Sequence, residues 1–284
     1  MSVLEVRGCS IRFGGVQAAH DVTLRAGEWE IVGVIGPNGA GKTTIFNIIT
    51  GFYRPDAGSV WFKGTDVTRL EVHERTALGV GRTFQNVGLV KSSTVRENLL
   101  TAQHLEAGYS ALAGMLGLPH TFTAERRMRR RAEAVAEILG LSDLLDSRVA
   151  GLPYGVLKRV ELGAVLATDP DLLLLDEPTS GMGPEEAHKF GTTLLELRRE
   201  FELTVVMIEH HVPLVTQVCD YVYCLNFGEL LAEGSPEQVR SHPEVVRAYL
   251  GEEADSAPGT PGGSGVSPGM PGGSGVSPGM NVSA

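Results

Sequence analysis

The segment Gly36-Pro37-Asn38-Gly39-Ala40-Gly41-Lys42-Thr43-Thr44 constrains the fold more than any other part of the chain. It matches the phosphate-binding pattern G-x-x-x-x-G-K-[ST]. The apolar run 29–35 before it predicts a buried strand, and residues 44–49 after it predict a helix. A strand that leads through glycines into a helix N-terminus directs backbone N–H groups and the helix dipole toward an anion. This context favours a phosphate site, with Lys42 on the phosphates and Thr43 as an Mg²⁺ ligand, over a surface turn that carries a lysine.

Composition narrows the class of protein around this segment. The chain has 284 residues, 42% of them hydrophobic, which is enough to bury a substantial core. No apolar run approaches the roughly 20 residues that a membrane helix needs, and the first residues lack the apolar stretch of a signal peptide. A net charge of −10 argues against nucleic acid as the main partner. The three cysteines, Cys9, Cys219 and Cys224, form no C-x-x-C pair, so we expect free thiols in a reducing cytosol.

The first half of the chain changes from strand-like to helical near residue 94. Short apolar stretches before residue 28 predict strands separated by Gly8, by Gly14-Gly15 and by Gly27. Further on, Thr94-Val95-Arg96-Glu97 has the form of a capping box and predicts a helix from Val95. A second helix is predicted over 124–139, and its arginine run 126–131 favours a solvated face. Contact with a membrane partner or anionic lipid headgroups is the alternative for that run.

The chain ends in a segment of a different kind. Residues 261–270 are repeated identically as residues 271–280, and glycine, serine and proline dominate the repeat. Such a composition cannot bury enough apolar surface to offset the conformational entropy lost on folding. We therefore expect a disordered tail from about residue 252. Before it, Ser235-Pro236-Glu237-Gln238 predicts the start of a C-terminal helix.

Two acidic residues provide the second half of the predicted nucleotide site. Residues 171–176 form an apolar run that reads as a buried parallel strand, and it ends in Asp176-Glu177. An acid at the end of this strand holds Mg²⁺ in phosphate-loop ATPases, and the next acid can polarise an attacking water. The alternative is an aspartate that only caps the following turn.

With these motifs in place, the chain resembles the ATPase subunits of ABC transporters from about residue 3 to residue 251. The resemblance rests on the order and spacing of several short segments. These are Gly36 to Thr44, Phe84-Gln85, Leu152-Pro153-Tyr154-Gly155, Leu172 to Pro178, Ser180-Gly181 and Glu209-His210. Segments 82–86, 97–104, 152–162, 234–239 and 247–251 make it similar to the ATPases of branched-chain amino acid importers.

The resemblance implies roles for individual residues. Phe13 matches the aromatic residue that stacks on adenine, with a core aromatic as the alternative. Gln85 matches the glutamine that contacts Mg²⁺ and the attacking water. Glu177 matches the catalytic acid, and His210 matches the histidine that contacts the γ-phosphate. His211 is adjacent, but Glu209-His210 closes the preceding strand in register, so His210 is our prediction.

The sequence departs from the family at three places. One is Gly163-Ala164-Val165, where the family commonly has an arginine between alanines. The usual Leu-Ser-Gly-Gly-Gln signature reads Leu152-Pro153-Tyr154-Gly155-Val156, so the serine hydroxyl is absent and Pro153 has no N–H. Only the Gly155 N–H and the following helix N-terminus remain to meet a nucleotide there. The segment Ser180-Gly181-Met182-Gly183 lacks the aspartate usual after the catalytic acid. We interpret the signature as a variant and not as a dead site.

The implied fold is α/β: a P-loop ABC ATPase core with a mixed β-sheet flanked by helices, an antiparallel β subdomain and an inserted α-helical subdomain. We expect the β subdomain and phosphate loop over 1–93, the helical subdomain over 94–152, the rest of the core over 153–251 and the tail over 252–284.

The implied function is ATP hydrolysis, with ATP and Mg²⁺, in an importer for branched-chain amino acids. The expected partners are a second ATPase subunit, identical or different, two membrane permeases, and an external binding protein reached through them. The expected location is the inner face of the plasma membrane. Alternatives are an ABC system for urea, amides or lipopolysaccharide, a non-hydrolysing regulatory subunit, or a soluble ABC protein acting on ribosomes or DNA.

Overall fold

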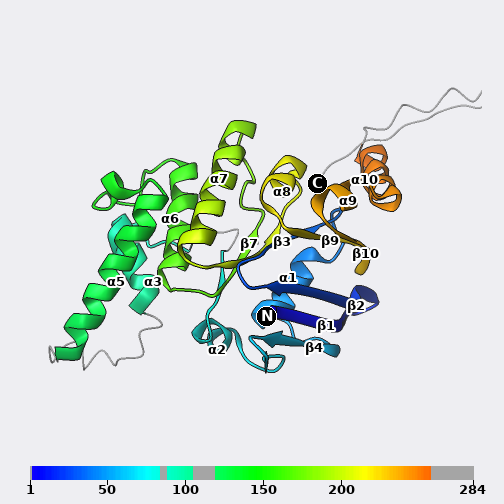
Figure 1. Cartoon of the computed structure of the whole chain (residues 1–284), viewed down its shortest axis with the longest axis horizontal. Coiled ribbons are helices and arrows are strands. Elements are labelled where there is room, and N and C mark those ends of the chain that lie inside the picture. The colour runs from blue at the N-terminus through cyan, green and yellow to red at the C-terminus, as the bar shows by residue number, and fades with distance from the viewer. Residues whose placement is uncertain (1, 84–87, 105–118, 257–284) are drawn as a thin grey trace, which may run out of the picture.

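The computed structural model describes residues 2–83, 88–104 and 119–256 and folds them around two β-sheets (Figure 1). The smaller sheet is antiparallel, with the order β2-β1-β4-β5. Its strands are β1 (Ser2–Phe13), β2 (Val16–Gly27), β4 (Ala57–Phe62) and β5 (Thr65–Asp66). This sheet is the predicted antiparallel β subdomain.

The prediction that Gly8 separates two strands is wrong, because Gly8 lies inside β1. The register of β1 against β2 shifts between Val6 and Cys9, and Gly8 has a φ of 56°. A glycine at positive φ accommodates an extra residue in one strand of an antiparallel pair without ending it. The other two expected breaks, at Gly14-Gly15 and at Gly27, are confirmed.

The larger sheet has the order β10-β9-β3-β8-β7-β6, and only the edge strand β10 runs antiparallel to its neighbour. Every residue of β3, β7 and β8 is buried, as the apolar runs predicted for parallel strands covered on both faces. The strands are β3 (Ile31–Ile35), β6 (Val80–Arg82), β7 (Leu172–Asp176), β8 (Thr204–Ile208), β9 (Tyr221–Asn226) and β10 (Glu229–Gly234).

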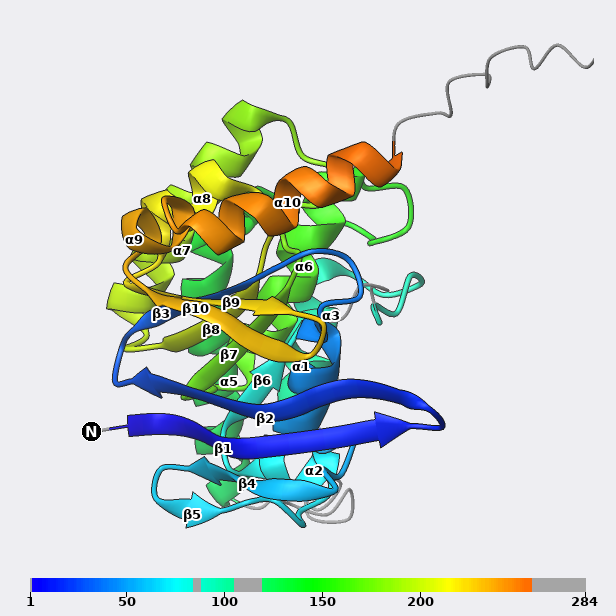
Figure 2. The same ribbon diagram turned by 90° about the vertical axis from the view of Figure 1, so that its right-hand side faces the viewer.

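The two faces of this sheet contribute to two different cores. On one face, Leu172 and Leu174 pack in a cluster with the antiparallel sheet and helix α1 (Lys42–Thr50). On the other face, Leu173 and Leu175 pack with α7 (Pro184–Glu200) and α8 (Val212–Val218). Figure 2 shows α1 and the small sheet on one side of the large sheet, with α7 and α8 on the other. Three further helices complete this part: α2 (Val72–Ala77), α9 (Pro236–Arg240) and α10 (Pro243–Ser256).

A helical lobe extends from the sheet opposite β9 and β10 (Figure 1). It contains α3 (Val95–His104), α5 (Pro119–Ile138), the short 3₁₀ helix Ser142–Leu144 and α6 (Tyr154–Ala167). The capping box before α3 is confirmed, since Thr94 and Glu97 exchange side-chain to backbone hydrogen bonds of 2.7 and 3.1 Å. Helix α6 packs against α3 and α5 and also contacts β6 of the large sheet.

The arginine run on α5 is solvated except at its last member. Arg126, Arg127, Arg129 and Arg130 are exposed. Arg131 instead forms an ion pair of 2.8 Å with Asp169, and its guanidinium lies 4.1 Å from the centre of the Phe201 ring. Assigning the whole run to a solvated face was therefore wrong for Arg131, because tertiary partners lie against that side of the helix.

At the C-terminus, α10 extends to Ser256, four residues past the expected start of the tail. The repeats at 261–280 lie outside the described residues. Within the described ranges, no helix is both long enough and apolar enough to cross a membrane. Cys9, Cys219 and Cys224 are free and buried, and burial raises the pKa of the Cys9 thiol to about 11.

Candidate functional site

Three of the predicted site segments meet at the carboxyl edge of the large sheet. Strand β8 lies between β3 and β7. The phosphate loop follows β3, Asp176 and Glu177 stand at the end of β7, and Glu209-His210 follow β8. Because parallel strands end at the same edge, three segments far apart in sequence converge there. Gln85, predicted from the family resemblance to contact Mg²⁺ and the attacking water, lies outside the described residues.

The glycines of the phosphate loop occupy positions where a side chain would collide with backbone. A Cβ at Gly36 would lie 2.2 Å from the Leu225 carbonyl oxygen, and one at Gly41 would lie 2.5 Å from the Ala18 carbonyl oxygen. Both glycines also have φ values in the left-handed half, 145° and 97°. Close approach and backbone conformation therefore each require glycine here.

Lys42 is buried at the first position of α1, with 8% of its surface exposed. Its Nζ donates hydrogen bonds to the carbonyl oxygens of Gly36 (2.6 Å) and Pro37 (2.8 Å). These two hydrogen bonds hold the ammonium group against the start of the loop that would bind the phosphates. Gly41 caps α1 without a side-chain hydrogen bond, which leaves the N-terminal N–H groups of the helix directed at the loop. In the first turn of α1, Thr43 is exposed and Thr44 is half-buried.

Asp176 ends β7 with its carboxylate buried and its two oxygens in unequal surroundings. The Oδ2 atom pairs with Arg82 at 2.9 Å. The Oδ1 atom is buried and has no hydrogen-bond partner among the described residues. A buried carboxylate oxygen without a partner, at the strand end that faces the phosphate loop, fits a hard divalent cation or its bound water.

Glu177 follows directly and adopts a conformation that is rare for a residue with a side chain. Its φ is 48°, and its N–H donates to the Ile208 carbonyl oxygen at 2.9 Å. A non-glycine residue in the left-handed region carries a strain of about 1–3 kcal/mol, and such outliers cluster at functional sites. The turn directs the chain away from β7 immediately after the two acids.

Glu209 joins two loops of the site, a role that its sequence neighbours do not indicate. Its carboxylate is fully buried. One oxygen accepts hydrogen bonds from the N–H and the hydroxyl of Thr179, just after Glu177. The other accepts from the N–H groups of His210 (2.8 Å) and His211 (3.0 Å). The partners across this junction are 30 residues apart in sequence, so only the strand order of the sheet could have suggested it.

The two adjacent histidines differ in their surroundings. The His210 side chain is 61% exposed at the carboxyl edge, with its Nδ1 3.9 Å from Glu209 Oε2. His211 is the N-cap of α8, and its Nδ1 is buried without a partner among the described residues. His211 is half-buried, so the more exposed His210 ring is the better candidate for contact with a nucleotide.

Phe13 is not a core residue, since 44% of its surface is exposed at the end of β1. Its ring packs edge-to-face against Tyr53, with centroids 5.0 Å apart. Tyr53 comes just after the C-terminal end of α1, so this contact places Phe13 near the end of the helix that is opposite the phosphate loop. A partly exposed aromatic ring of this kind is suitable for stacking on a base.

The signature segment lies at the open N-terminus of α6. Pro153 is the N-cap and makes no side-chain hydrogen bond to the helix. Gly155 is exposed, and a Cβ added to it would have no atom within 4 Å. A Cβ at Gly181 would lie 4.0 Å from the Tyr154 ring, so the signature segment and the segment 180–183 are neighbours.

A hydrogen bond connects the C-terminal helix α10 to the phosphate loop. The Tyr249 hydroxyl on α10 accepts a hydrogen bond of 2.9 Å from the N–H of Gly36. The two residues are 213 positions apart, and no local pattern in the sequence indicated the contact.

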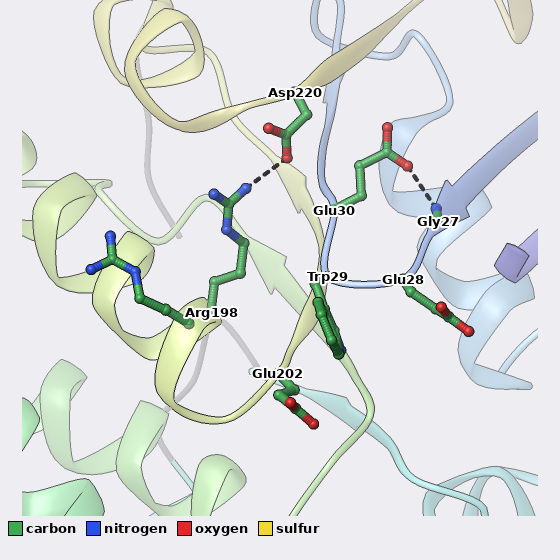
Figure 3. Close-up of a pocket in the computed structure, with 8 residues that line it drawn as sticks. Gly27, Glu28, Trp29, Glu30, Arg198, Glu202 and Asp220 are labelled. Atoms are coloured by element: carbon green, nitrogen blue, oxygen red, sulfur yellow. Dashed lines mark hydrogen bonds and ion pairs between the residues drawn. The ribbon is translucent and has the colours of Figure 1, made fainter. Parts of the chain in front are cut away.

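A separate cavity of about 560 Å³ lies at the opposite, amino edge of the sheet (Figure 3). Trp29 and Glu30 precede β3 there, and Glu202 precedes β8. Arg198 points to Asp220 and pairs with it at 2.8 Å. None of the predicted site residues lines this cavity.

Comparison with known sequences gives two family matches along the chain. Residues 19–180 match the ABC transporter family, and residues 229–255 match the C-terminal segment described as "branched-chain amino acid ATP-binding cassette transporter". The chain is 41% identical over 250 residues to the high-affinity branched-chain amino acid transport ATP-binding protein BraF of Pseudomonas aeruginosa. This alignment covers 88% of the chain and 98% of the relative. It is 40% identical over 250 residues to LivG of Escherichia coli, a protein with the same description, with the same coverage.

Among solved structures, the chain resembles ATP-binding cassettes from ABC transporters. A nucleotide-free cassette is 34% identical with a TM-score of 0.75, and one in its ADP conformation is 33% identical with a TM-score of 0.76. Each comparison covers 88% of this chain and 99% of the other. The expected α/β cassette fold is confirmed.

Proposed function

The chain belongs to the ABC transporter family as an ATP-binding ATPase subunit, and from this premise we propose that it drives the uptake of branched-chain amino acids. The observation that carries the substrate class is the match of residues 229–255 to a segment named for branched-chain amino acid cassettes. Relatives with names of the same kind align over almost their whole length. The proposed location is the cytoplasmic face of the membrane, against two permease subunits.

In the proposed site, the phosphate loop holds the nucleotide. The N–H groups of Gly39 to Thr44 and the N-terminus of α1 face the phosphates. Lys42 exchanges its two carbonyl partners for phosphate oxygens, and Phe13 stacks on the adenine. Tyr249 fixes the first glycine of the loop from the side of α10.

The residues at the end of β7 fit a magnesium ion. Thr43 supplies a hydroxyl, and Asp176 supplies the buried Oδ1 that lacks a partner in the described part of the chain. Gln85 is proposed as a further ligand. When bound, Mg²⁺ neutralises charge on the β- and γ-phosphate oxygens.

Hydrolysis is proposed to depend on Glu177 and His210. Glu177 accepts a hydrogen bond from the attacking water and orients it toward the γ-phosphate. His210 contacts the γ-phosphate from the end of β8. Glu209 holds both segments in register, because its two oxygens accept from Thr179 on one side and from His210 and His211 on the other.

The second ATPase subunit is proposed to complete the site. The N-terminus of α6 is open to solvent, and Gly155 leaves its backbone free for close approach. In this arrangement the α6 terminus of one subunit meets the phosphates held by the other. ATP then favours the closed pair, and hydrolysis reopens it, which moves the permeases by differential binding. Selection of the amino acid falls to the permeases and an external binding protein.

The substrate class is tested by uptake into membrane vesicles that contain the full chain with its co-purified membrane partners. We expect ATP-dependent accumulation of labelled leucine, isoleucine or valine, and its loss in the Glu177→Gln variant. Movement of labelled urea or amides in the absence of any branched-chain amino acid would overturn the substrate class and leave the transporter role.

The paired site is tested separately with Glu177→Gln and ATP. Because hydrolysis is blocked, the closed pair should accumulate and elute earlier from a size-exclusion column. If the variant stays monomeric with ATP, even beside its partner ATPase, the shared-site proposal fails.

A further inference from the structure

Arg82 is a buried cation at the edge of the proposed magnesium site. It ends β6, pairs in register with Leu174 of β7, and its side chain is 9% exposed. A buried guanidinium is costly unless it is paired and hydrogen-bonded. In the sequence, Arg82 is distinguished only as the first residue of segment 82–86, one of the segments that carry the family resemblance.

The contacts of Arg82 connect three parts of the site. Its Nη2 donates to Asp176 Oδ2 at 2.9 Å, and its Nη1 donates to Asn47 Oδ1 at 2.7 Å. The guanidinium carbon also lies 5.6 Å from the centre of the Phe46 ring. Asn47 and Phe46 belong to α1, the helix that begins with Lys42. The guanidinium therefore joins the phosphate-loop helix to the carboxylate at the end of β7.

The Arg82–Asp176 ion pair neutralises the carboxylate of Asp176 before nucleotide binds. Asp176 is buried, and Arg82 is the cation that pairs with it in the described structure. With this counter-charge present, the carboxylate alone is a weak attractor for a divalent cation. The free Oδ1 can still join a cation that arrives with its own phosphate oxygens.

We propose that Arg82 is the built-in counter-charge of Asp176, which keeps divalent cations out of the empty site and admits them only together with nucleotide. This inference rests on the proposed role of Asp176. Arg82 acts through Asp176 and is a positioning residue. The planar fork of arginine suits this position because it contacts Asp176 and Asn47 at once, which a lysine ammonium does less well.

The proposal predicts that a divalent cation can replace the missing arginine. In Arg82→Met, the Asp176 carboxylate is left buried without its partner, so the full chain should melt at a lower temperature. Millimolar Mg²⁺ without nucleotide should then raise the melting temperature of this variant by about 5 °C, through binding to the folded state. Wild type should shift by less than about 1 °C in the same titration. Sodium chloride at matched ionic strength should not reproduce the effect.

Three further variants make the test specific. Arg82→Lys keeps the charge and should show no Mg²⁺ response. Arg131→Met removes an ion pair and an aromatic contact of the same kinds in the helical lobe, but its partner Asp169 is half-exposed, so its melting should not respond to Mg²⁺. Arg82→Met/Asp176→Asn removes both charges, so it should regain stability and lose the Mg²⁺ response. This double variant also covers the case in which Arg82→Met fails to fold.

These melting measurements test the role of Arg82 without nucleotide and without ATP hydrolysis. If Mg²⁺ stabilises Arg82→Met no more than wild type, or stabilises the double variant equally, Arg82 only anchors α1 and the inference is overturned. Such a result would leave the ATPase assignment intact, because that assignment is tested by hydrolysis and by Lys42.

Discussion

The two regions proposed to contact one ATP molecule are built in opposite ways. At the carboxyl edge of the large sheet, Lys42, Asp176 and Glu209 are buried, and each has hydrogen-bonded or ion-paired partners within the chain. At the N-terminus of α6, Tyr154 is 56% exposed and Gly155 has open space where a Cβ would stand. One region is organised within a single chain, and the other presents backbone to the outside.

This contrast separates two kinds of mutational effect. Changes at the carboxyl edge should alter chemistry and also the stability of the isolated subunit, because the side chains there hold neighbouring loops together. Changes at the α6 terminus should leave the isolated subunit intact and weaken only the ATP-dependent pair. Substitutions in the two regions can test this separation.

The largest effect is expected from Lys42→Ala. The variant loses the cation proposed to contact the phosphates, together with the two hydrogen bonds to the Gly36 and Pro37 carbonyl oxygens. Loss of a single charge-stabilising donor in an active site commonly costs about 10²–10³ in rate, so ATPase activity should fall at least about 100-fold. Phosphate release by the purified chain measures this. Lys189→Ala, which removes an exposed lysine paired with Glu185, is the control. Unchanged turnover in Lys42→Ala would sink the phosphate-loop assignment.

The next effect, at Glu209, tests whether the carboxyl edge works as one unit. In Glu209→Gln, one oxygen becomes an NH₂ group that faces N–H or O–H donors from Thr179 or from the two histidines. An unmatched buried donor costs about 1–3 kcal/mol, so the melting temperature should fall by several degrees. We expect kcat to fall by roughly tenfold or more with little change in the KM for ATP, because the displaced groups act after binding.

A matched control for Glu209 is Glu161→Gln, a buried acid on α6 outside this junction. It should affect stability without the selective loss of kcat. Equal kinetic effects of the two variants would mean that Glu209 has no special connection to the catalytic loops.

The sequence predicted what depends on local pattern and could not predict what depends on register between distant strands. The glycine spacing, the acids at the end of β7 and the capping box before α3 can each be recognised from a few consecutive residues. Glu209 is different, because its partner Thr179 is on another loop and the contact exists only if β7 and β8 are neighbours.

The same limit explains the remaining differences. Arg82 pairs with an acid 94 residues away, and Tyr249 contacts a glycine 213 residues away. Gly8 was expected to break a strand because glycine is common in turns. Strand β1 nevertheless continues past Gly8, because it pairs with β2 on one side and with β4 on the other. Arg131 was assigned to solvent from its neighbours along the helix, while Asp169 and Phe201 decide its position.

A smaller effect, with the opposite signature, is expected at the α6 terminus. Gly155→Ala adds a methyl group that meets nothing in the isolated subunit, so its melting temperature should stay unchanged or rise slightly. The methyl group would intrude where the partner's phosphates approach. ATP-dependent association, measured by size exclusion in the Glu177→Gln background, should weaken by about tenfold, which corresponds to about 1.4 kcal/mol.

The same substitution at another glycine of α6 provides the comparison. A Cβ at Gly163 would lie 3.0 Å from Leu99 and 3.1 Å from Leu139 inside the helical lobe. Gly163→Ala should therefore shift the melting temperature and leave association as it is. If Gly155→Ala instead changes melting and spares association, the α6 terminus is not an assembly surface.

The smallest effect is expected at Tyr249, where the C-terminal helix reaches the organised region. Tyr249→Phe removes one hydroxyl and leaves the buried Gly36 N–H without this acceptor, a loss worth about 1 kcal/mol. Tyr223→Phe is a matched control, because its hydroxyl accepts the Arg25 N–H at 3.0 Å, away from the phosphate loop. Both variants should lose similar stability, but only Tyr249→Phe should raise the KM for ATP, by a few fold. Tyr249 lies in the segment that matches branched-chain amino acid cassettes, so a KM effect would give that segment a physical connection to nucleotide binding. Equal KM values in the two variants would mean that α10 only packs against the core.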